Sequence, residues 1–292
     1  MAVDPEELEP LVGLFDDRDT VVTGLVNDRL ASFGPEVVRS LRNMAEREQS
    51  PVRKSLIVDR AQSLNTEFKL ADFQDFTTRA PGPLSLFEGS WILSSLFDYT
   101  LQRERYEDLF FRCSQEYLAE GSDMRTGIEN IRILNHIFFH HLKFTLYDVQ
   151  LQDPKYAPVS DALKTRNGNP FTLAFIYLMI CQVAGLPVEL VCFPGGFIPV
   201  YVEGGKVLFY INIYRGGDIF LKDRLQGFLK ATGLKIDQQN FRRRDESAML
   251  TLYLESLLYI HSNRKDDKKS AVIDRALNCL GPERYLTIDE PE

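Results

Sequence analysis

The segment from residue 165 to residue 217 restricts the fold more than any other part of this sequence. Asn169 is a good N-cap, and Pro170 suits the first position of a helix. Residues 171–184 are apolar on nearly every side, and Gly185 ends the run. A helix of about 14 residues is shorter than the roughly 20 residues that cross a bilayer. We therefore expect a short helix buried in the core of a soluble domain.

Three strand signals follow this helix. They cover residues 188–193, 197–202 and 206–214, and all are rich in β-branched and aromatic side chains. Glycines between them supply the backbone conformations that tight antiparallel connections require. Because the remaining amphipathic windows are helical, we predict an α+β, mostly helical fold in which a buried helix packs on a small antiparallel sheet.

The same segment carries a set of motifs. A basic residue, a glycine, a proline and a leucine enter the helix, at Arg166, Gly168, Pro170 and Leu173. Pro194 and Phe197 frame the first turn of the sheet, and Asn212 and Gly217 follow at the end of the last strand. These motifs resemble the transglutaminase-like branch of the papain-type fold, in particular the SirB-type family, which has a tetratricopeptide-like helical tail.

The resemblance covers most of the chain. Residues 129–144 are similar to the family's helix ahead of the core, and residues 14–41 to its N-terminal helical repeat. It implies a papain/transglutaminase-like core with an N-terminal helical region and a C-terminal helical hairpin. The expected domains are an N-terminal helical, HEAT-like region at 1–80, the transglutaminase-like core at 81–233, and a tetratricopeptide-like hairpin at 234–292.

The wider superfamily uses a cysteine nucleophile at the helix N-terminus, a histidine base on a following strand, and an Asp or Asn that orients the histidine. The resemblance assigns these positions to Thr172, Gly196 and Asn212. A threonine hydroxyl needs a strong base to become nucleophilic, and glycine cannot hold a proton. Residues 142–260 contain no histidine. We interpret the site as a degenerate triad with no catalytic residue and no acyl-transfer chemistry.

Two cysteines and a histidine are the candidates to replace the missing catalytic groups. Cys181 and Cys192 lie in apolar segments, where cysteine behaves as a small hydrophobic residue. His141 lies near the edge of the apolar stripe of a helix expected at 127–143, as a core or boundary residue. A short distance between His141 and Thr172 would restore a catalytic pair.

His136 and His140 have the i, i+4 spacing that two zinc ligands can share. Their neighbours on the same stripe are charged, which indicates a solvated helix face, whereas Ile128, Ile131 and Phe138 are expected to point to the core. No third ligand has a suitable spacing. We therefore expect no metal site, and no cofactor.

The regions on either side of residues 165–217 are predicted to be helical. Residues 8–48 resemble one HEAT-type hairpin, with Gly34 and the following proline at its turn; an ordinary helical bundle explains them equally well. Residues 80–84 contain helix-breaking prolines and a glycine, and they are the best candidate for a turn between the first helices and the helices before the core. A helix should end at Gly233, followed by a polar linker that includes residues 242–244, and helices at 249–264 and 268–281 should form the final hairpin.

The composition of the chain indicates which partners and which cellular compartment are expected for the protein. The formal net charge is −8, so phosphate backbones and anionic membranes are not expected as partners. The four cysteines show no paired metal spacing, which favours a reducing compartment. The first ten residues lack the pattern of a signal peptide, and a cytoplasmic location is expected.

Three classes of function stay open. The favoured one is a non-catalytic protein that binds an unknown protein or peptide partner, or acts as a scaffold, through the groove of the degenerate site. The alternatives are a cysteine- or threonine-type peptidase, amidase or acyltransferase with a rebuilt site, and a purely structural helical protein whose groove is filled by Phe193 or Phe197. The candidate groove residues are Arg166, Asn169, Thr172, Cys192, Gly196, Phe197, Asn212 and Tyr214.

Overall fold

The structure is a computed structural model and describes residues 3–79, 82–120, 122, 124–193, 196–231 and 243–286. The chain divides into two compact units. The N-terminal unit comprises Met1–Phe76 and Ser95–Leu101, and the main unit comprises Thr77–Ser94 and Gln102–Glu292. Pro194 of the expected sheet turn, Gly233 at the expected helix end and Arg242 of the expected linker lie outside the described residues.

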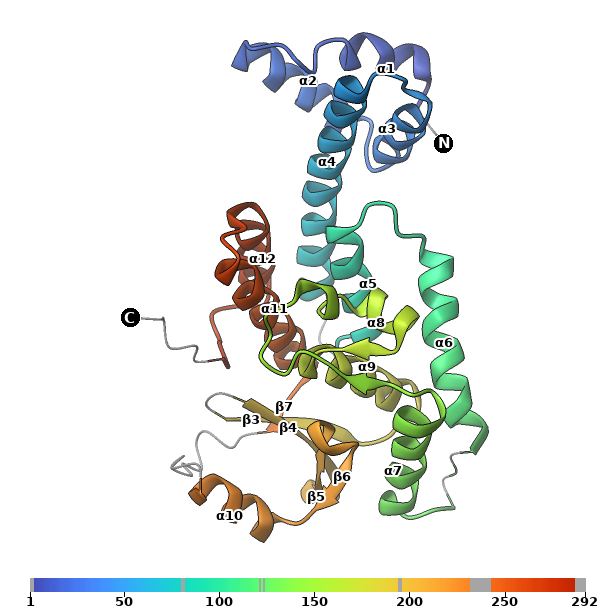
Figure 1. Ribbon diagram of the computed structural model, residues 1–292, viewed down its shortest axis with the longest axis vertical. Helices are drawn as coiled ribbons and strands as arrows, with labels where there is room; N and C mark the ends of the chain where they lie inside the picture. Colours follow the sequence, from blue (N-terminus) through green and yellow to red (C-terminus); the bar gives the residue numbers. More distant parts are fainter. Residues whose placement is uncertain are drawn as a thin grey trace. The chain divides into compact units, whose positions relative to one another are not determined.

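The N-terminal unit is helical (Figure 1). Its helices are α1 (Pro5–Val12), α2 (Thr20–Ser32), α3 (Glu36–Arg47) and most of α4 (Pro51–Thr78). Gly34 has a φ of +73° at the turn between α2 and α3, where the sequence predicted it. Leu30, Leu41 and Ile57 are among its fully buried core residues. The span expected as one hairpin, 8–48, also holds the end of α1.

The main unit opens with helices that precede the central helix. They are most of α5 (Leu86–Phe97), α6 (Arg103–Glu120), α7 (Gly127–Asn135), the π-helix η1 (His136–His141), the 3₁₀-helix η2 (Pro154–Tyr156) and α8 (Val159–Thr165). A two-stranded parallel sheet joins β1 (Thr145–Leu146) to β2 (Asn167–Gly168). The helix expected over 127–143 thus changes type at His136. Since a π-helix has more residues per turn, the positions after 135 rotate away from a regular α-helical stripe.

The orientation of Ile128 was predicted wrongly. Ile131 and Phe138 are buried, as expected, but Ile128 is 41% exposed. It lies in the first turn of α7, beside the exposed residues Met124 and Arg125. The sequence pattern alone does not show that the packed stripe begins only at the second turn.

The central helix α9 (Pro170–Val183) is buried along nearly its whole length. It begins as predicted, because the side chain of the N-cap Asn169 accepts the backbone N–H of Thr172 and Pro170 occupies the first turn. Residues Phe171 to Cys181 are all buried. The expectation of an apolar helix inside the core is confirmed.

The main sheet has five antiparallel strands in the order β6-β5-β4-β3-β7. Their bounds are β3 (Val188–Phe193), β4 (Gly196–Glu203), β5 (Lys206–Asn212), β6 (Asp218–Phe220) and β7 (Arg243–Arg244), with the 3₁₀-helix η3 (Ile213–Arg215) between β5 and β6. Figure 1 shows α9 above this sheet and α10 (Lys222–Ala231) below it. The predicted α+β, mostly helical fold is confirmed.

One segment of the predicted polar linker is instead a strand. Arg243 and Arg244 pair with Val191 and Leu190 at the edge of β3. The guanidinium of Arg243 forms an ion pair with Glu189 at 3.3 Å, and that of Arg244 with Glu283 at 3.1 Å. These partners are distant in the sequence, so a local charge pattern cannot reveal them.

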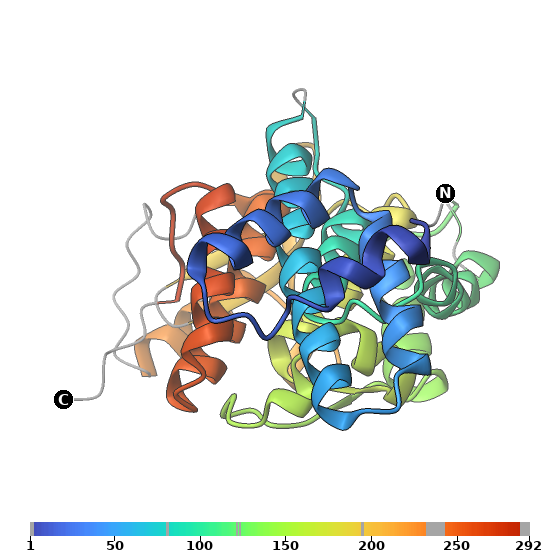
Figure 2. The ribbon, with the colours of Figure 1, turned by 90° about the horizontal axis from the view of Figure 1, so that it is seen from above.

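The last two helices, α11 (Glu246–Asn263) and α12 (Asp267–Cys279), form a hairpin, as expected (Figure 2). Helix α11 contacts both α9 and β3. The hairpin therefore packs on the core through α11, and it contributes Tyr253 to the interior beside Phe175, with ring centroids 5.0 Å apart.

Candidate functional site

The register of the sheet brings two of the three triad positions to one end. Strand β4 starts at Gly196 and β5 ends at Asn212, and these antiparallel strands are neighbours, so both positions lie at the same end of the sheet. The first turn of α9 reaches this end as well. The ring of Phe171 lies 5.1 Å from that of Phe197, measured between centroids. The three positions expected for the triad therefore lie near the same end of the sheet.

The side chain at the nucleophile position is directed elsewhere. Thr172 has no exposed surface, and its Oγ1 lies 2.7 Å from the carbonyl oxygen of Ala157 and 3.0 Å from Oδ1 of Asn169. One hydroxyl proton is thus held between two acceptors. No hydrogen bond joins Thr172 to a titratable group within the described residues. In this arrangement the hydroxyl is neither activated nor accessible to a substrate.

A second hydroxyl reaches the same carbonyl from the C-terminal hairpin. Tyr253 in α11 donates to the Ala157 oxygen at 3.2 Å and accepts the N–H of Val159 at 3.3 Å. Burial raises the pKa of Tyr253, so it stays protonated and neutral. Helix α11 therefore packs beside the buried start of α9, where Tyr253 and Thr172 share the Ala157 carbonyl.

His141 lies outside this cluster. Its Nδ1 is 3.2 Å from a carboxylate oxygen of Glu116, and its side chain is 60% exposed. The expectation of a core or boundary histidine was wrong, because the π-helical turn η1 carries residue 141 off the regular apolar stripe. The carboxylate beside His141 is a surface group of α6, and the hydroxyl of Thr172 donates to other atoms.

Two of the predicted groove residues, the half-buried Arg166 and the buried Asn169, are held by contacts within the chain. Arg166 has a left-handed backbone, with a φ of +62°, and its Nη1 lies 2.7 Å from both Sγ of Cys113 and the carbonyl oxygen of Leu163. Its guanidinium also stacks over Phe144. Asn169 is fully buried as the cap of α9, and its Nδ2 has no hydrogen-bond partner within the described residues.

The cysteines are poor nucleophiles in this structure. Cys192 is 4% exposed, and burial raises its pKa to about 12. Burial also raises the pKa of Cys181 inside α9 and that of Cys113 in α6. At neutral pH these thiols are protonated, and a protonated thiol is neither a nucleophile nor a metal ligand.

The two histidines with zinc-like spacing stand on η1. The rings of His136 and His140 are 5.6 Å apart between centroids, and both residues are exposed. Within the described residues, no group of three or more histidine, cysteine, aspartate or glutamate side chains is arranged to hold a metal ion.

Of the remaining four candidates, Gly196 begins β4, and the other three line an open pocket at the same end of the sheet. Phe197, Asn212 and Tyr214 border a cavity of about 530 Å³, and Thr172 is not among its lining residues. The ring of Phe197 lies between Phe171 and Tyr214, 5.1 and 6.4 Å away between centroids. Phe197 is 2% exposed, whereas Tyr214 is 44% exposed. We call this cavity the sheet-end pocket; its other lining residues are Phe193, Ile198, Arg215, Asp218, Phe220, Arg224 and Leu225.

Sequence reasoning missed the residues from β6 and α10. Phe220 and Leu225 add apolar surface, and Arg215, Asp218 and Arg224 add charge to the border of the pocket. A short turn after η3 returns the chain along β5, with Asn212 paired to Asp218. The close spacing of two glycines at 216 and 217 was the available signal for that turn.

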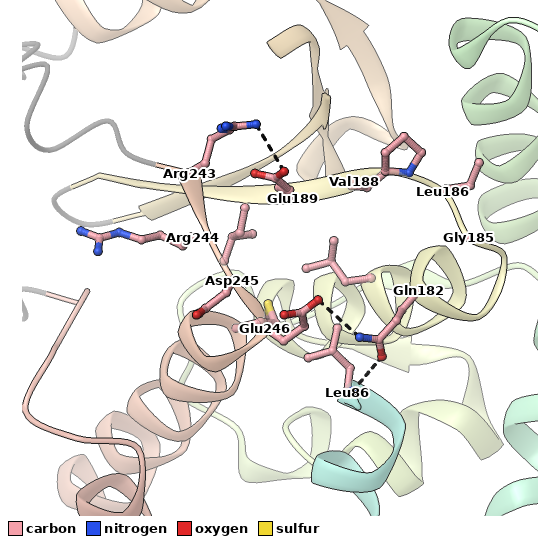
Figure 3. A pocket seen from close by; sticks show the side chains of 14 residues that line it. Leu86, Gln182, Gly185, Leu186, Val188, Glu189, Arg243, Arg244, Asp245 and Glu246 are labelled. Carbon is pink, nitrogen blue, oxygen red and sulfur yellow. Dashed lines mark hydrogen bonds and ion pairs between the residues drawn. The ribbon is translucent and has the colours of Figure 1, made fainter. Parts of the chain in front are cut away.

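A larger cavity, of about 760 Å³, lies between the start of β3 and the start of α11 (Figure 3). Several of its polar side chains are already paired within the chain. Gln182 accepts the N–H of Leu86 at 2.9 Å and donates to Glu246 at 3.4 Å, and Arg243 pairs with Glu189. Asp245 caps α11 by accepting the N–H of Ala248. This cavity lies away from all three triad positions.

A profile of the transglutaminase-like superfamily matches residues 103–254, just over half of the chain. This span runs from α6 to the middle of α11 and contains α9 and all five strands of the main sheet. No curated protein and no solved structure matches the chain. In the described part of the chain, no helix is both long and apolar enough to span a membrane.

Proposed function

The chain belongs to the transglutaminase-like superfamily, and from this premise we propose that it is a non-catalytic member that binds a protein or peptide partner through the sheet-end pocket. One observation carries the proposal. The hydroxyl of Thr172 is buried against the Ala157 carbonyl, while Phe197, Asn212 and Tyr214 border an open cavity. The position of the nucleophile has become part of the core, and the adjoining surface has stayed open.

The chemistry of the pocket supports a binding role. A volume of about 530 Å³ falls within the range of sites that accept a small ligand or a few side chains. Aromatic residues such as Tyr214 supply contact area at a small entropic cost, and they are common at binding hot spots. Asn212 adds an amide that can donate to or accept from a peptide backbone.

We also propose the finer assignments that the sequence suggested. They are a SirB-type subfamily, the domain division 1–80, 81–233 and 234–292, a scaffold or regulatory role, and a cytoplasmic location without nucleic-acid or membrane partners. The C-terminal hairpin α11–α12 supports the first of these, and the four free cysteines are compatible with a reducing compartment.

The decisive experiment is a selection of random peptides on the purified full-length protein, followed by affinity measurements. Peptides selected on the wild type should lose affinity for Tyr214→Ala and keep it for Leu208→Ala. Tyr214 and Leu208 are both 44% exposed, but only Tyr214 lines the pocket, so the pair separates a pocket effect from loss of surface area. Selected peptides that bind both variants equally well would refute the assignment of the pocket.

The enzyme alternative is tested on the same material. Wild type and Thr172→Ala should give the same background in assays of amide hydrolysis and of amine incorporation into a glutamine-containing protein. Turnover by the wild type that disappears in Thr172→Ala would overturn the non-catalytic assignment. A wild type with neither turnover nor peptide affinity would favour the structural alternative.

A further inference from the structure

Two arginines on the border of the sheet-end pocket have no ionic partner. Arg215 in η3 and Arg224 in α10 are exposed, and neither forms an ion pair or a side-chain hydrogen bond with any described residue. Some other arginines of the main unit form ion pairs, as in the contacts of Arg103 with Glu88 and of Arg243 with Glu189. The two free guanidinium groups make the border locally cationic in a chain whose net charge is −8.

The interior of the pocket is apolar. Phe193, Phe197, Ile198, Phe220 and Leu225 line it, and three of these side chains are aromatic rings. A ligand that fills this cavity must therefore present a large apolar group. The two arginines favour carboxylates next to that apolar group, since a guanidinium offers planar, paired N–H donors that match a carboxylate.

From this arrangement we propose that the sheet-end pocket binds an acidic peptide segment, with one aromatic or large aliphatic side chain in the cavity and flanking carboxylates on Arg215 and Arg224. The inference rests on the proposed function and names the class of its partner. Asp218 also borders the pocket, and its negative charge repels the carboxylates of such a peptide. This repulsion limits the selectivity for acidic peptides. Peptides with flanking lysines are repelled by the two arginines and attracted only by Asp218.

The larger cavity of Figure 3 does not offer the same selectivity. Its two arginines are neutralised by carboxylates of the chain itself, Arg243 by Glu189 and Arg244 by Glu283. A ligand carboxylate there would first have to displace an existing ion pair. The free cations at the sheet end carry no such cost.

The test uses four fluorescein-labelled peptides and fluorescence anisotropy on the full-length protein. The peptides are Gly-Glu-Glu-Phe-Glu-Glu-Gly, its analogues with Gln or Lys in place of every Glu, and the acidic peptide with Ala in place of Phe. We expect the acidic phenylalanine peptide to bind best, the Gln peptide more weakly and the Lys peptide weakest. Loss of the phenyl group should also weaken binding.

Three variants assign the charge effect to the border of the pocket. Arg224→Gln should weaken binding of the acidic peptide by about two- to fivefold and leave the Gln peptide unchanged, as expected for an exposed ion pair. Asp218→Asn should strengthen binding of the acidic peptide by a similar factor. Lys222→Gln, which removes the same charge two residues before Arg224 but outside the pocket lining, should have no such effect.

The outcomes separate this inference from the proposed function. Equal affinities for the acidic and Gln peptides, or equal effects of Arg224→Gln and Lys222→Gln, would overturn the acidic preference and leave peptide binding intact. Binding that depends on Glu but not on the phenyl group would indicate a site for carboxylates alone, and would also overturn it. If neither these four peptides nor a selected library binds the wild type, both proposals fail together.

Discussion

The hydroxyls of Thr172 and Tyr253 meet at one acceptor, the carbonyl oxygen of Ala157, at 2.7 and 3.2 Å. Thr172 belongs to α9 and Tyr253 to α11, so a single buried carbonyl joins the central helix to the C-terminal hairpin. Ala157 is 1% exposed, and water does not reach its oxygen as a replacement donor. The buried hydroxyl of Thr172 is therefore a structural element of the core.

This shared acceptor predicts coupling between two substitutions. Thr172→Val and Tyr253→Phe each remove one donor to this carbonyl and leave the other in place. Thr172→Val should lower the unfolding free energy by about 0.5–1.5 kcal/mol, and Tyr253→Phe by about 1–3 kcal/mol, because it also leaves the buried N–H of Val159 unpaired. The double variant leaves the carbonyl unpaired and should lose roughly 1 kcal/mol more than the sum. Urea denaturation of the four proteins measures this, with Thr172→Ser as the control that keeps the hydroxyl. Strict additivity would show that the two hydroxyls act independently.

Sequence patterns predicted the elements of the core well, because those elements depend on local signals. The cap at Asn169, the apolar run after it and the strand at Val188–Phe193 all follow from short-range chemistry. The grouping of Phe197, Asn212 and Tyr214 in one pocket follows from the motif positions together with the antiparallel register.

The contacts that bury the hydroxyl of Thr172 join residues that are far apart in the sequence. The acceptor of Thr172 lies 15 residues earlier and the second donor 96 residues after that acceptor, and no spacing rule connects them. The same limit applies to β7, whose two arginines join β3 across more than 50 residues. The π-helical turn at His136–His141 also has no recognised sequence signal, and it is what directed His141 outward.

Thiol reactivity should distinguish the four cysteines. Cys113, Cys181 and Cys192 are buried with raised pKa values, whereas Cys279 near the end of α12 is partly exposed. An aromatic disulfide reagent at pH 8 should therefore modify the native protein at Cys279 alone, and modify all four thiols only in denaturant. Replacement by Cys279→Ser should remove the native reaction. Rapid labelling of Cys192 in the native state would instead show an accessible nucleophile next to the sheet.

Stability should fall in mild acid because of His261. This residue of α11 is 9% exposed, and burial lowers its pKa below 6.5, an effect that Lys269 and Arg264 reinforce and Asp266, 3.4 Å away, opposes. The unfolded chain then binds a proton more readily than the folded one, so the stabilisation is complete above pH 6.5 and is lost as the pH falls below it.

The measurement for His261 is the unfolding free energy of wild type and His261→Gln between pH 7.5 and 5. The wild type should lose more stability over this range than the variant, in which residue 261 does not titrate. Parallel pH profiles would assign the acid sensitivity to other groups. The buried Glu255 is not one of them, because burial raises its pKa and its protonation therefore favours the folded state as the pH falls.

The turn after η3 offers a matched pair of glycines. Gly216 and Gly217 both have left-handed backbones, with φ of +61° and +79°. A Cβ at Gly216 would meet no atom within 4 Å, whereas a Cβ at Gly217 would overlap the amide of Asn135. That amide is fixed at both ends, since Nδ2 donates to the Gly217 carbonyl at 2.6 Å and Oδ1 accepts the hydroxyl of Tyr177 at 2.8 Å.

Gly216→Ala should therefore cost only the backbone strain, about 1–2 kcal/mol, and Gly217→Ala should cost a further 1–3 kcal/mol or so from the overlap with Asn135. Chemical denaturation of both variants gives the difference directly. Asn135→Ala in the Gly217→Ala background should recover part of the loss, because it removes the amide in the way. Equal costs for the two glycines would mean that Asn135 moves aside freely, and that the end of α7 is not held against the turn that borders the sheet-end pocket.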